Sequence, residues 1–300
     1  MINWPGGSIA AMSEPIRRMG AMSDKYLAKI AALLRKAEST DNEHEADAYL
    51  QAAQRLATLS SVDLAVARTH ITATEKRPTP TQRTVSIGEP GKRGLKTYVQ
   101  LFLEIGRANN LTCDIAANSS RVFAYGFDTD IDAAEALYAS LVVQMVRDSD
   151  AYIKSGRYAE ELVARQVRVE GSGRYRYWAG NMRYDYVEQE RPVHPSTARI
   201  NFQFGFAVRI GKRLAAAKTS AQQQAVAQDQ GTGVEMVLRA REVELADHYR
   251  ATSTARGSWR ASSSRAGYSE LSQRAGDKAG RSARLGGEKA IGGEQRRIGA

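Results

Sequence analysis

The first clear hydrophobic pattern in the chain is a pair of apolar stripes at helical spacing. The first stripe follows a capping residue at position 23 or 24 and consists of Leu27, Ile30, Leu34 and Ala37. The second consists of Ala46, Tyr49, Leu50, Ala53 and Leu56. Residues 38–42 between them form a short polar turn. Because neither helix can bury its own stripe, the pattern predicts an antiparallel helical hairpin over residues 23–70.

The hairpin also carries a sequence motif. The first helix ends in the run Leu33-Leu34-x-x-Ala37-Glu38-Ser39-Thr40, and the second contains Glu45-Ala46 and Ala53-Gln54-Arg55-Leu56-Ala57. On these residues, segment 25–68 resembles a family of bacteria and their phages that is catalogued as domain of unknown function 2786. The resemblance implies a helical hairpin, often followed by an α+β region, in a bacterial or phage protein. It implies no catalytic residue.

Residues 95–250 alternate between helix-like and strand-like patterns. The periodicity predicts helices over residues 95–109, 130–155 and 202–214, and a short strand followed by a helix over residues 234–249. Two alternating segments, Leu111 to Ile115 and Phe123 to Phe127, predict strands joined by a turn at residues 118–119. The chain is therefore predicted to have an α+β fold, with a small antiparallel sheet flanked by helices.

Three segments lack a strong apolar pattern. Residues 1–22 read as a flexible leader, and residues 71–94 read as a linker that contains an edge strand at Thr84–Ile87. Residues 251–300 are rich in Gly, Ser and Ala, and from Arg250 onward the chain has eleven Lys and Arg against four Asp and Glu. We expect this basic tail to be disordered. The alternative is a short helix that packs closely on a neighbour through Ala275, Ala279 and Ala283 with Gly276 and Gly280.

Composition limits the possible functions. One cysteine excludes an internal disulfide framework and a multi-cysteine zinc site. No apolar run is long enough to span a bilayer and no secretory signal is visible, so a cytoplasmic location without membrane contact is expected. The net charge of +10 favours a DNA or RNA partner. Arginine in place of lysine, as a GC-rich coding sequence produces, explains the charge equally well.

The segment from Arg168 to Arg191 is the strongest candidate for nucleic-acid binding. It interleaves guanidinium groups, which neutralise phosphates, with aromatic rings, which stack on unpaired bases. The candidate residues are Arg174, Tyr175, Arg176, Tyr177, Trp178, Arg183 and Tyr184, together with Arg296 and Arg297 in the tail. The alternative is a β-hairpin that packs its aromatic rings onto the core. The second functional hypothesis is a protein-interaction or structural role, in which the helical hairpin is the docking surface for a partner protein.

The sequence gives no positive support for catalysis. Asp128, Asp130 and Asp132 have the spacing of a calcium loop, but the turn glycine and the bidentate glutamate of that loop are missing. We therefore expect these acids to cap the following helix. The four histidines are scattered, and Cys113 is expected to be a buried, inert thiol. No cofactor, metal or catalytic residue is predicted, and a metal-dependent hydrolase is the weakest of the functional hypotheses.

Overall fold

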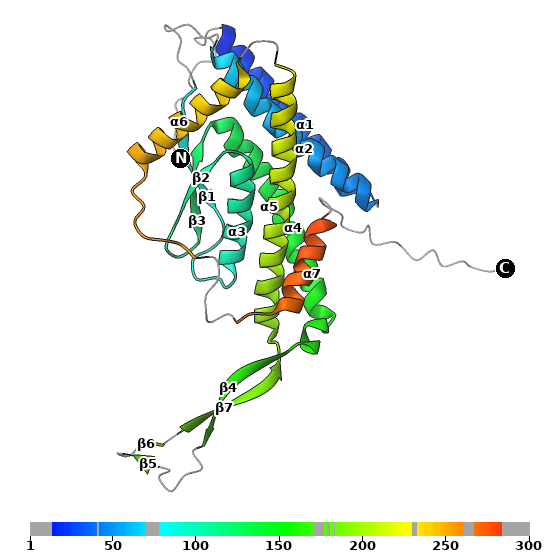
Figure 1. The fold of residues 1–300 in the computed structure, drawn as a ribbon, viewed down its shortest axis with the longest axis vertical. Helices are drawn as coiled ribbons and strands as arrows, with labels where there is room; N and C mark the ends of the chain where they lie inside the picture. The colour runs from blue at the N-terminus through cyan, green and yellow to red at the C-terminus, as the bar shows by residue number, and fades with distance from the viewer. Residues whose placement is uncertain are drawn as a thin grey trace, which may run out of the picture.

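The computed structural model describes residues 14–40, 42–69, 78–170, 177–178, 181–182, 184–229, 233–260 and 267–283. Helices α1 (Glu14–Ser39) and α2 (Glu43–Thr69) form the predicted antiparallel hairpin (Figure 1). Helix α1 begins at Glu14, so the second half of the predicted leader is helical instead. The two helices are joined by a hydrogen bond in which the Tyr26 hydroxyl donates to the Asp63 carboxylate over 2.5 Å.

The sheet has three antiparallel strands in the order β1-β3-β2. Strands β2 (Thr112–Ile115) and β3 (Arg121–Gly126) are the two strands predicted from alternation. Strand β1 (Thr81–Ser86) pairs along the other edge of β3, with Val85 opposite Val122. The sheet therefore begins inside the segment that the sequence marks as a linker, where only an edge strand at residues 84–87 is expected.

Helices cover both faces of this sheet. Helices α3 (Leu95–Ala108) and α4 (Asp128–Lys154) pack on one face. The end of α6 (Val234–Thr252) reaches the other, where the rings of Tyr249 and Tyr125 meet edge to face at 5.0 Å. The short strand predicted near residue 234 is wrong. Positions 234, 238, 241 and 245 follow helical spacing, so the whole segment continues as one helix.

One hydrophobic core joins the hairpin to the α+β part. It contains Ile30 and Leu50 from the hairpin together with Phe102, Leu137 and Phe206 from α3, α4 and α5. Helix α5 (Pro195–Ala227) runs through the middle of the molecule and contacts α2, α3 and α4 (Figure 1). The hairpin therefore buries its apolar stripes in the same core as α3, α4 and α5.

Helix α6 is held to the hairpin and to α4 by a buried ion pair. The Arg241 guanidinium donates to the Asp130 carboxylate over 2.8 Å and to the Ser61 carbonyl over 2.6 Å. The side chains of Arg241 and Asp130 are only 7% and 4% exposed. Burial raises the pKa of Asp130, and the guanidinium opposes that rise.

The three acids at the start of α4 do not cap it as expected. The N-cap is Phe127, which provides no side-chain hydrogen bond. Asp128 and Asp132 instead bind Arg83 of β1, while Asp130 binds Arg241 as described. The three acids therefore form ion pairs with arginines from elements distant in sequence. Local spacing does not reveal such pairs.

A two-stranded arm extends from the helical body (Figure 1). Its strands β4 (Leu162–Glu170) and β7 (Tyr184–Pro192) pair over their full length. The short strands β5 (Tyr177–Trp178) and β6 (Asn181–Met182) pair with each other at the far end. The arm follows a short 3-10 helix at Arg157–Glu160. A second hydrophobic cluster lies at the base of the arm. The cluster consists of Tyr152, Val193, Ala198 and Phe202.

The prediction of a disordered tail is wrong for residues 270–281, which form helix α7 (Glu270–Arg281) on the side of α5. Ser272, Gly276 and Gly280 are buried at four-residue spacing. A Cβ atom at Gly276 would lie 1.9 Å from the Phe202 carbonyl oxygen, so glycine is what allows the two helix backbones to meet. This is the close-packed helix that the glycine and alanine spacing offered as the alternative.

Candidate nucleic-acid interface

The structure describes none of the side chains predicted to bind nucleic acid. Arg174, Tyr175, Arg176 and Arg183 in the arm, and Arg296 and Arg297 in the tail, lie outside the described residues. For Tyr177, Trp178 and Tyr184 the backbone alone is described. Strand β5, which contains Tyr177 and Trp178, lies at the far end of the arm, away from the helical body (Figure 1). The predicted set of binding residues therefore stays a prediction.

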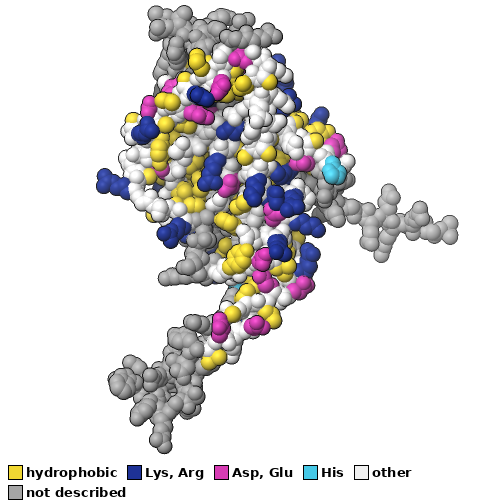
Figure 2. Space-filling model, in the orientation of Figure 1, with side chains coloured by type: hydrophobic (Ala, Val, Ile, Leu, Met, Phe, Trp, Pro, Cys, Tyr) yellow, Lys and Arg dark blue, Asp and Glu magenta, His cyan; other side chains and the backbone are white. Residues whose placement is uncertain are grey.

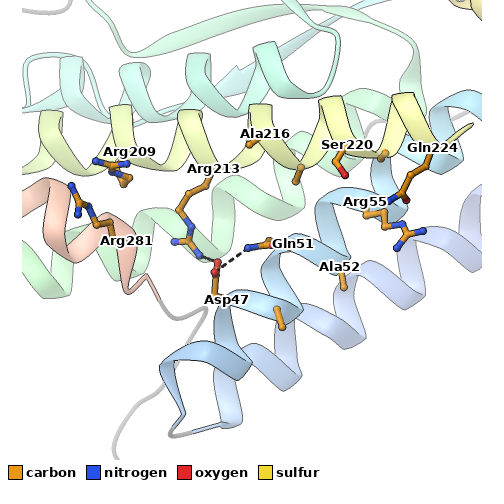
Figure 3. Close-up of a pocket in the computed structure, with 13 residues that line it drawn as sticks. Asp47, Gln51, Ala52, Arg55, Arg209, Arg213, Ala216, Ser220, Gln224 and Arg281 are labelled. Atoms are coloured by element: carbon orange, nitrogen blue, oxygen red, sulfur yellow. Dashed lines mark hydrogen bonds and ion pairs between the residues drawn. The ribbon is translucent and has the colours of Figure 1, made fainter. Parts of the chain in front are cut away.

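A groove of about 670 Å³ lies between α2 and α5, next to the end of α7. Alanines at positions 48, 52, 216, 217 and 221 line it, and their small side chains leave the groove open. The polar side chains along it include Asp47, Gln51, Ser220 and Gln224 and four arginines, Arg55, Arg209, Arg213 and Arg281. Figure 3 shows Asp47 and Arg213 pointing toward each other across the groove, with Arg55 near Gln224 at one end.

Two of these arginines fasten the walls of the groove together. Arg213 of α5 forms an ion pair with Asp47 of α2 and donates to the Gly280 carbonyl at the end of α7 over 2.6 Å. Arg209 donates to both oxygens of Asp277 over 2.6 and 2.8 Å. These hydrogen bonds lower the pKa of Asp277 below its usual range. The Asp47–Arg213 and Asp277–Arg209 pairs therefore connect α2, α5 and α7 to one another.

A second groove, of about 880 Å³, runs between α5 and α7 and shares Arg281 with the first. It is lined by the cations Lys212, Arg274 and Lys278. Its one aromatic lining residue is Tyr268, whose side chain is 62% exposed. Together the two grooves extend from Gly205 to Gln224 of α5, a length of about 28 Å at the rise of an α-helix.

The two grooves form one positively charged face, which we call the α5–α7 face. Seven Lys and Arg side chains line it against three carboxylates. Figure 2 shows Lys and Arg side chains gathered over α5 and α7. In the described part of the chain, no carboxylate forms an ion pair with Arg55, Lys212 or Lys278, and all three side chains are exposed. These three are free to bind an anion.

The sequence held a signal for this face that charge totals alone did not reveal. Arg274, Lys278 and Arg281 recur at four- and three-residue spacing, and the glycines at 276 and 280 fall between them. Read as a helix, that segment has a small face for packing and a basic face for solvent. Its placement beside Lys212 and Arg55 depends on tertiary packing and could not be found by spacing.

The described residues offer little for metal or nucleophilic chemistry. Among them, no group of three or more His, Cys, Asp and Glu side chains could hold a metal ion. Burial raises the pKa of the Cys113 thiol to about 12, so at neutral pH the thiol is protonated and a poor nucleophile. Within the described residues, no helix is long and apolar enough to cross a membrane.

Comparison with known families confirms the resemblance of the hairpin. Residues 25–64 match a family described as "Protein of unknown function (DUF2786)". Residues 25–64 of the hairpin are thus similar to this family. Neither the curated proteins nor the solved structures give a match to the chain. The matched segment contains Asp47, Gln51 and Arg55, and it therefore supplies one wall of the groove between α2 and α5.

Proposed function

We propose that this protein binds single-stranded nucleic acid along the α5–α7 face. The observation that carries the proposal is the excess of seven cations over three carboxylates along two joined grooves. A nucleic acid presents phosphates at regular intervals, and a groove that tracks several of them needs cations spread along its length. Arg55, Lys212 and Lys278 are distributed in this way over α2, α5 and α7.

The ion pairs within the grooves favour this function over simple neutralisation of acidic neighbours. Arg209 and Arg213 are held by Asp277 and Asp47, so the shape of the site is fixed before a ligand arrives. A fixed site loses less side-chain entropy on binding. The free cations, Arg55, Lys212 and Lys278, then supply the contacts to phosphate.

The exposed Tyr268 favours a single strand over a duplex. Its side chain lines the second groove together with Lys212, Arg274 and Lys278, and at 62% exposure the ring is accessible to an unpaired base. Stacking of an unpaired base on an aromatic ring contributes about 1–3 kcal/mol, whereas bases in a duplex are already stacked on each other. We therefore expect tighter binding to single-stranded than to double-stranded oligonucleotides.

The test is a salt series with fluorescently labelled oligonucleotides. Fluorescence anisotropy of the full chain gives the dissociation constant and its dependence on salt. Replacing Lys212 and Lys278 by glutamine should reduce the slope of log affinity against log salt by about 1.4, because each lost contact to a single strand removes about 0.7. Tyr268→Ala should weaken binding to a single strand roughly tenfold and leave its salt slope unchanged.

A matched control changes the net charge by the same amount elsewhere. Lys25 and Lys29 are exposed on α1 and line neither groove. Their double replacement by glutamine should leave the salt slope within error of the unmodified protein. If both double variants lose the same slope, binding depends on total charge and the proposed face is wrong. If neither double variant loses affinity, the proposed face is also wrong.

The arm and the tail extend this proposal to the residues singled out by sequence. Tyr177 and Trp178 lie on β5 at the end of the arm, and Arg296 and Arg297 follow α7 by about fifteen residues. If they contribute, Tyr177→Ala/Trp178→Ala should weaken single-strand binding, and deletion of residues 284–300 should lower the salt slope. Unchanged affinity in both variants would confine binding to the α5–α7 face.

A further inference from the structure

The free edge of β2 lies on a different part of the molecule from the α5–α7 face. Strand β2 is at the end of the sheet, with β3 on one side only. The Ala116 N–H donates to the Arg121 carbonyl over 3.0 Å, so residue 116 directs its backbone groups toward β3. In an antiparallel ladder the direction alternates, so Cys113 and Ile115 direct their N–H and C=O groups away from β3.

A segment of extended chain runs beside this edge without closing it. Residues 253–260 follow α6 and are attached at two points. The Ser253 hydroxyl donates to the Asp114 carboxylate over 2.7 Å, and the Trp259 indole N–H donates to the Ser119 hydroxyl over 3.2 Å. Between these points, no backbone hydrogen bond joins described residues of the segment to β2. A groove of about 1170 Å³ lies between the two.

Cations surround this groove. Lys96, Arg107, Arg256 and Arg260 line it, and Arg107 forms an ion pair with Glu104. The carboxylate nearest the edge, Asp114, is buried and accepts hydrogen bonds on both oxygens, from Tyr249 over 2.7 Å and from Ser253. Asp114 also lines the groove, and its two hydrogen bonds partly offset its charge. In the described part of the chain, Lys96, Arg256 and Arg260 have no ion-pair partner.

We propose that the β2 edge binds an extended acidic peptide segment of a partner protein as an added strand. The open N–H and C=O groups of Cys113 and Ile115 supply main-chain hydrogen bonds, and the surrounding cations select acidic side chains. Addition of one strand about 4.8 Å from β2 would turn the edge strand into an internal one. This site is independent of the nucleic-acid proposal, because it shares no lining residue with the α5–α7 face.

The first test uses the full chain and a labelled octapeptide of alternating Glu and Val. Its control is the same peptide N-methylated at every residue, which keeps the charge and removes every N–H donor. Binding of the first and at least tenfold weaker binding of the second are expected, since strand addition depends on main-chain hydrogen bonds. Equal binding of both peptides, or binding of neither, would overturn the proposal.

Two proline variants locate the edge. Ile115→Pro removes an N–H that points away from β3 and leaves the ladder to β3 intact. Thr84→Pro is the matched control, because the Ile87 N–H donates to Ser120 and Thr84 therefore points away from β3 on the opposite edge. Peptide affinity should fall at least tenfold in the first and stay unchanged in the second. Equal effects in both would overturn the assignment to β2.

A third measurement separates a peptide from a nucleic acid. Replacing Arg256 and Arg260 by glutamine should weaken the acidic peptide and leave single-stranded oligonucleotide affinity unchanged. If the oligonucleotide loses affinity in this variant while the peptide does not, the groove serves nucleic acid and the peptide proposal is wrong.

Discussion

Substitution of Gly276 by alanine tests the packing that builds the α5–α7 face. The added Cβ would lie 1.9 Å from the Phe202 carbonyl oxygen and 2.7 Å from its carbon, both backbone atoms that cannot rotate away. Helix α7 would have to retreat by about 1.5 Å to reach an ordinary contact distance, and a gap of that size removes most of the dispersion attraction along the helix pair. We expect the free energy of opening of α7 to fall by about 2 kcal/mol, after allowing for the higher helix propensity of alanine.

The assay is native-state hydrogen exchange of the α7 amides. A loss of 2 kcal/mol corresponds to roughly 30-fold faster opening of α7. Gly106→Ala is the matched control, since a Cβ there meets nothing closer than 3.5 Å and the helix should gain up to about 1 kcal/mol. If the α7 amides of Gly276→Ala exchange at the rate of the unmodified protein, close packing through this glycine is not what holds α7 on α5.

Two further predictions concern ionised groups. Arg241→Met leaves Asp130 buried without its ion-pair partner and should lower the free energy of unfolding in urea by about 3–5 kcal/mol. Arg239→Met removes an exposed ion pair and should lower it by less than about 0.5 kcal/mol. Similar losses in both variants would contradict the role of burial. The hydrogen bonds from Arg209 lower the pKa of Asp277, so its contribution to stability is present above its ordinary pKa of 3.8 and disappears as pH falls through the lowered value. Asp277→Asn should therefore flatten the pH dependence of the melting temperature in acid, and an unchanged acid profile would refute this.

Local patterns in the sequence predicted much of the fold. The stripes around Ile30 and Leu50 gave the hairpin, and alternation near Cys113 and Tyr125 gave two strands of the sheet. These elements bury one side against a core, so their periodicity records where the core lies. The strand expected near Val234 failed because a few apolar residues fit either period, and the later positions decided in favour of a helix.

The tail and the candidate sites were harder to predict because they depend on contacts between distant segments. Helix α7 has few large apolar residues, so its composition resembles disorder, yet Gly276 and Gly280 let its backbone lie directly on α5. Similarly, Asp130 and Arg241 are far apart in sequence, and only the fold brings them together. Spacing can reveal the basic face of one helix, but the meeting of Arg55, Lys212 and Lys278 on one surface requires the packing of three helices.

The most direct test of the central proposal is photo-crosslinking of the full chain to a single-stranded oligonucleotide that carries 4-thiouridine, followed by mass mapping of the crosslinked peptides. The proposal predicts crosslinks to Tyr268 and to peptides of α5 and α7, which disappear when excess unlabelled single strand is added. Crosslinks confined to residues outside the α5–α7 face would contradict the proposed site. The absence of any competable crosslink would contradict nucleic-acid binding itself.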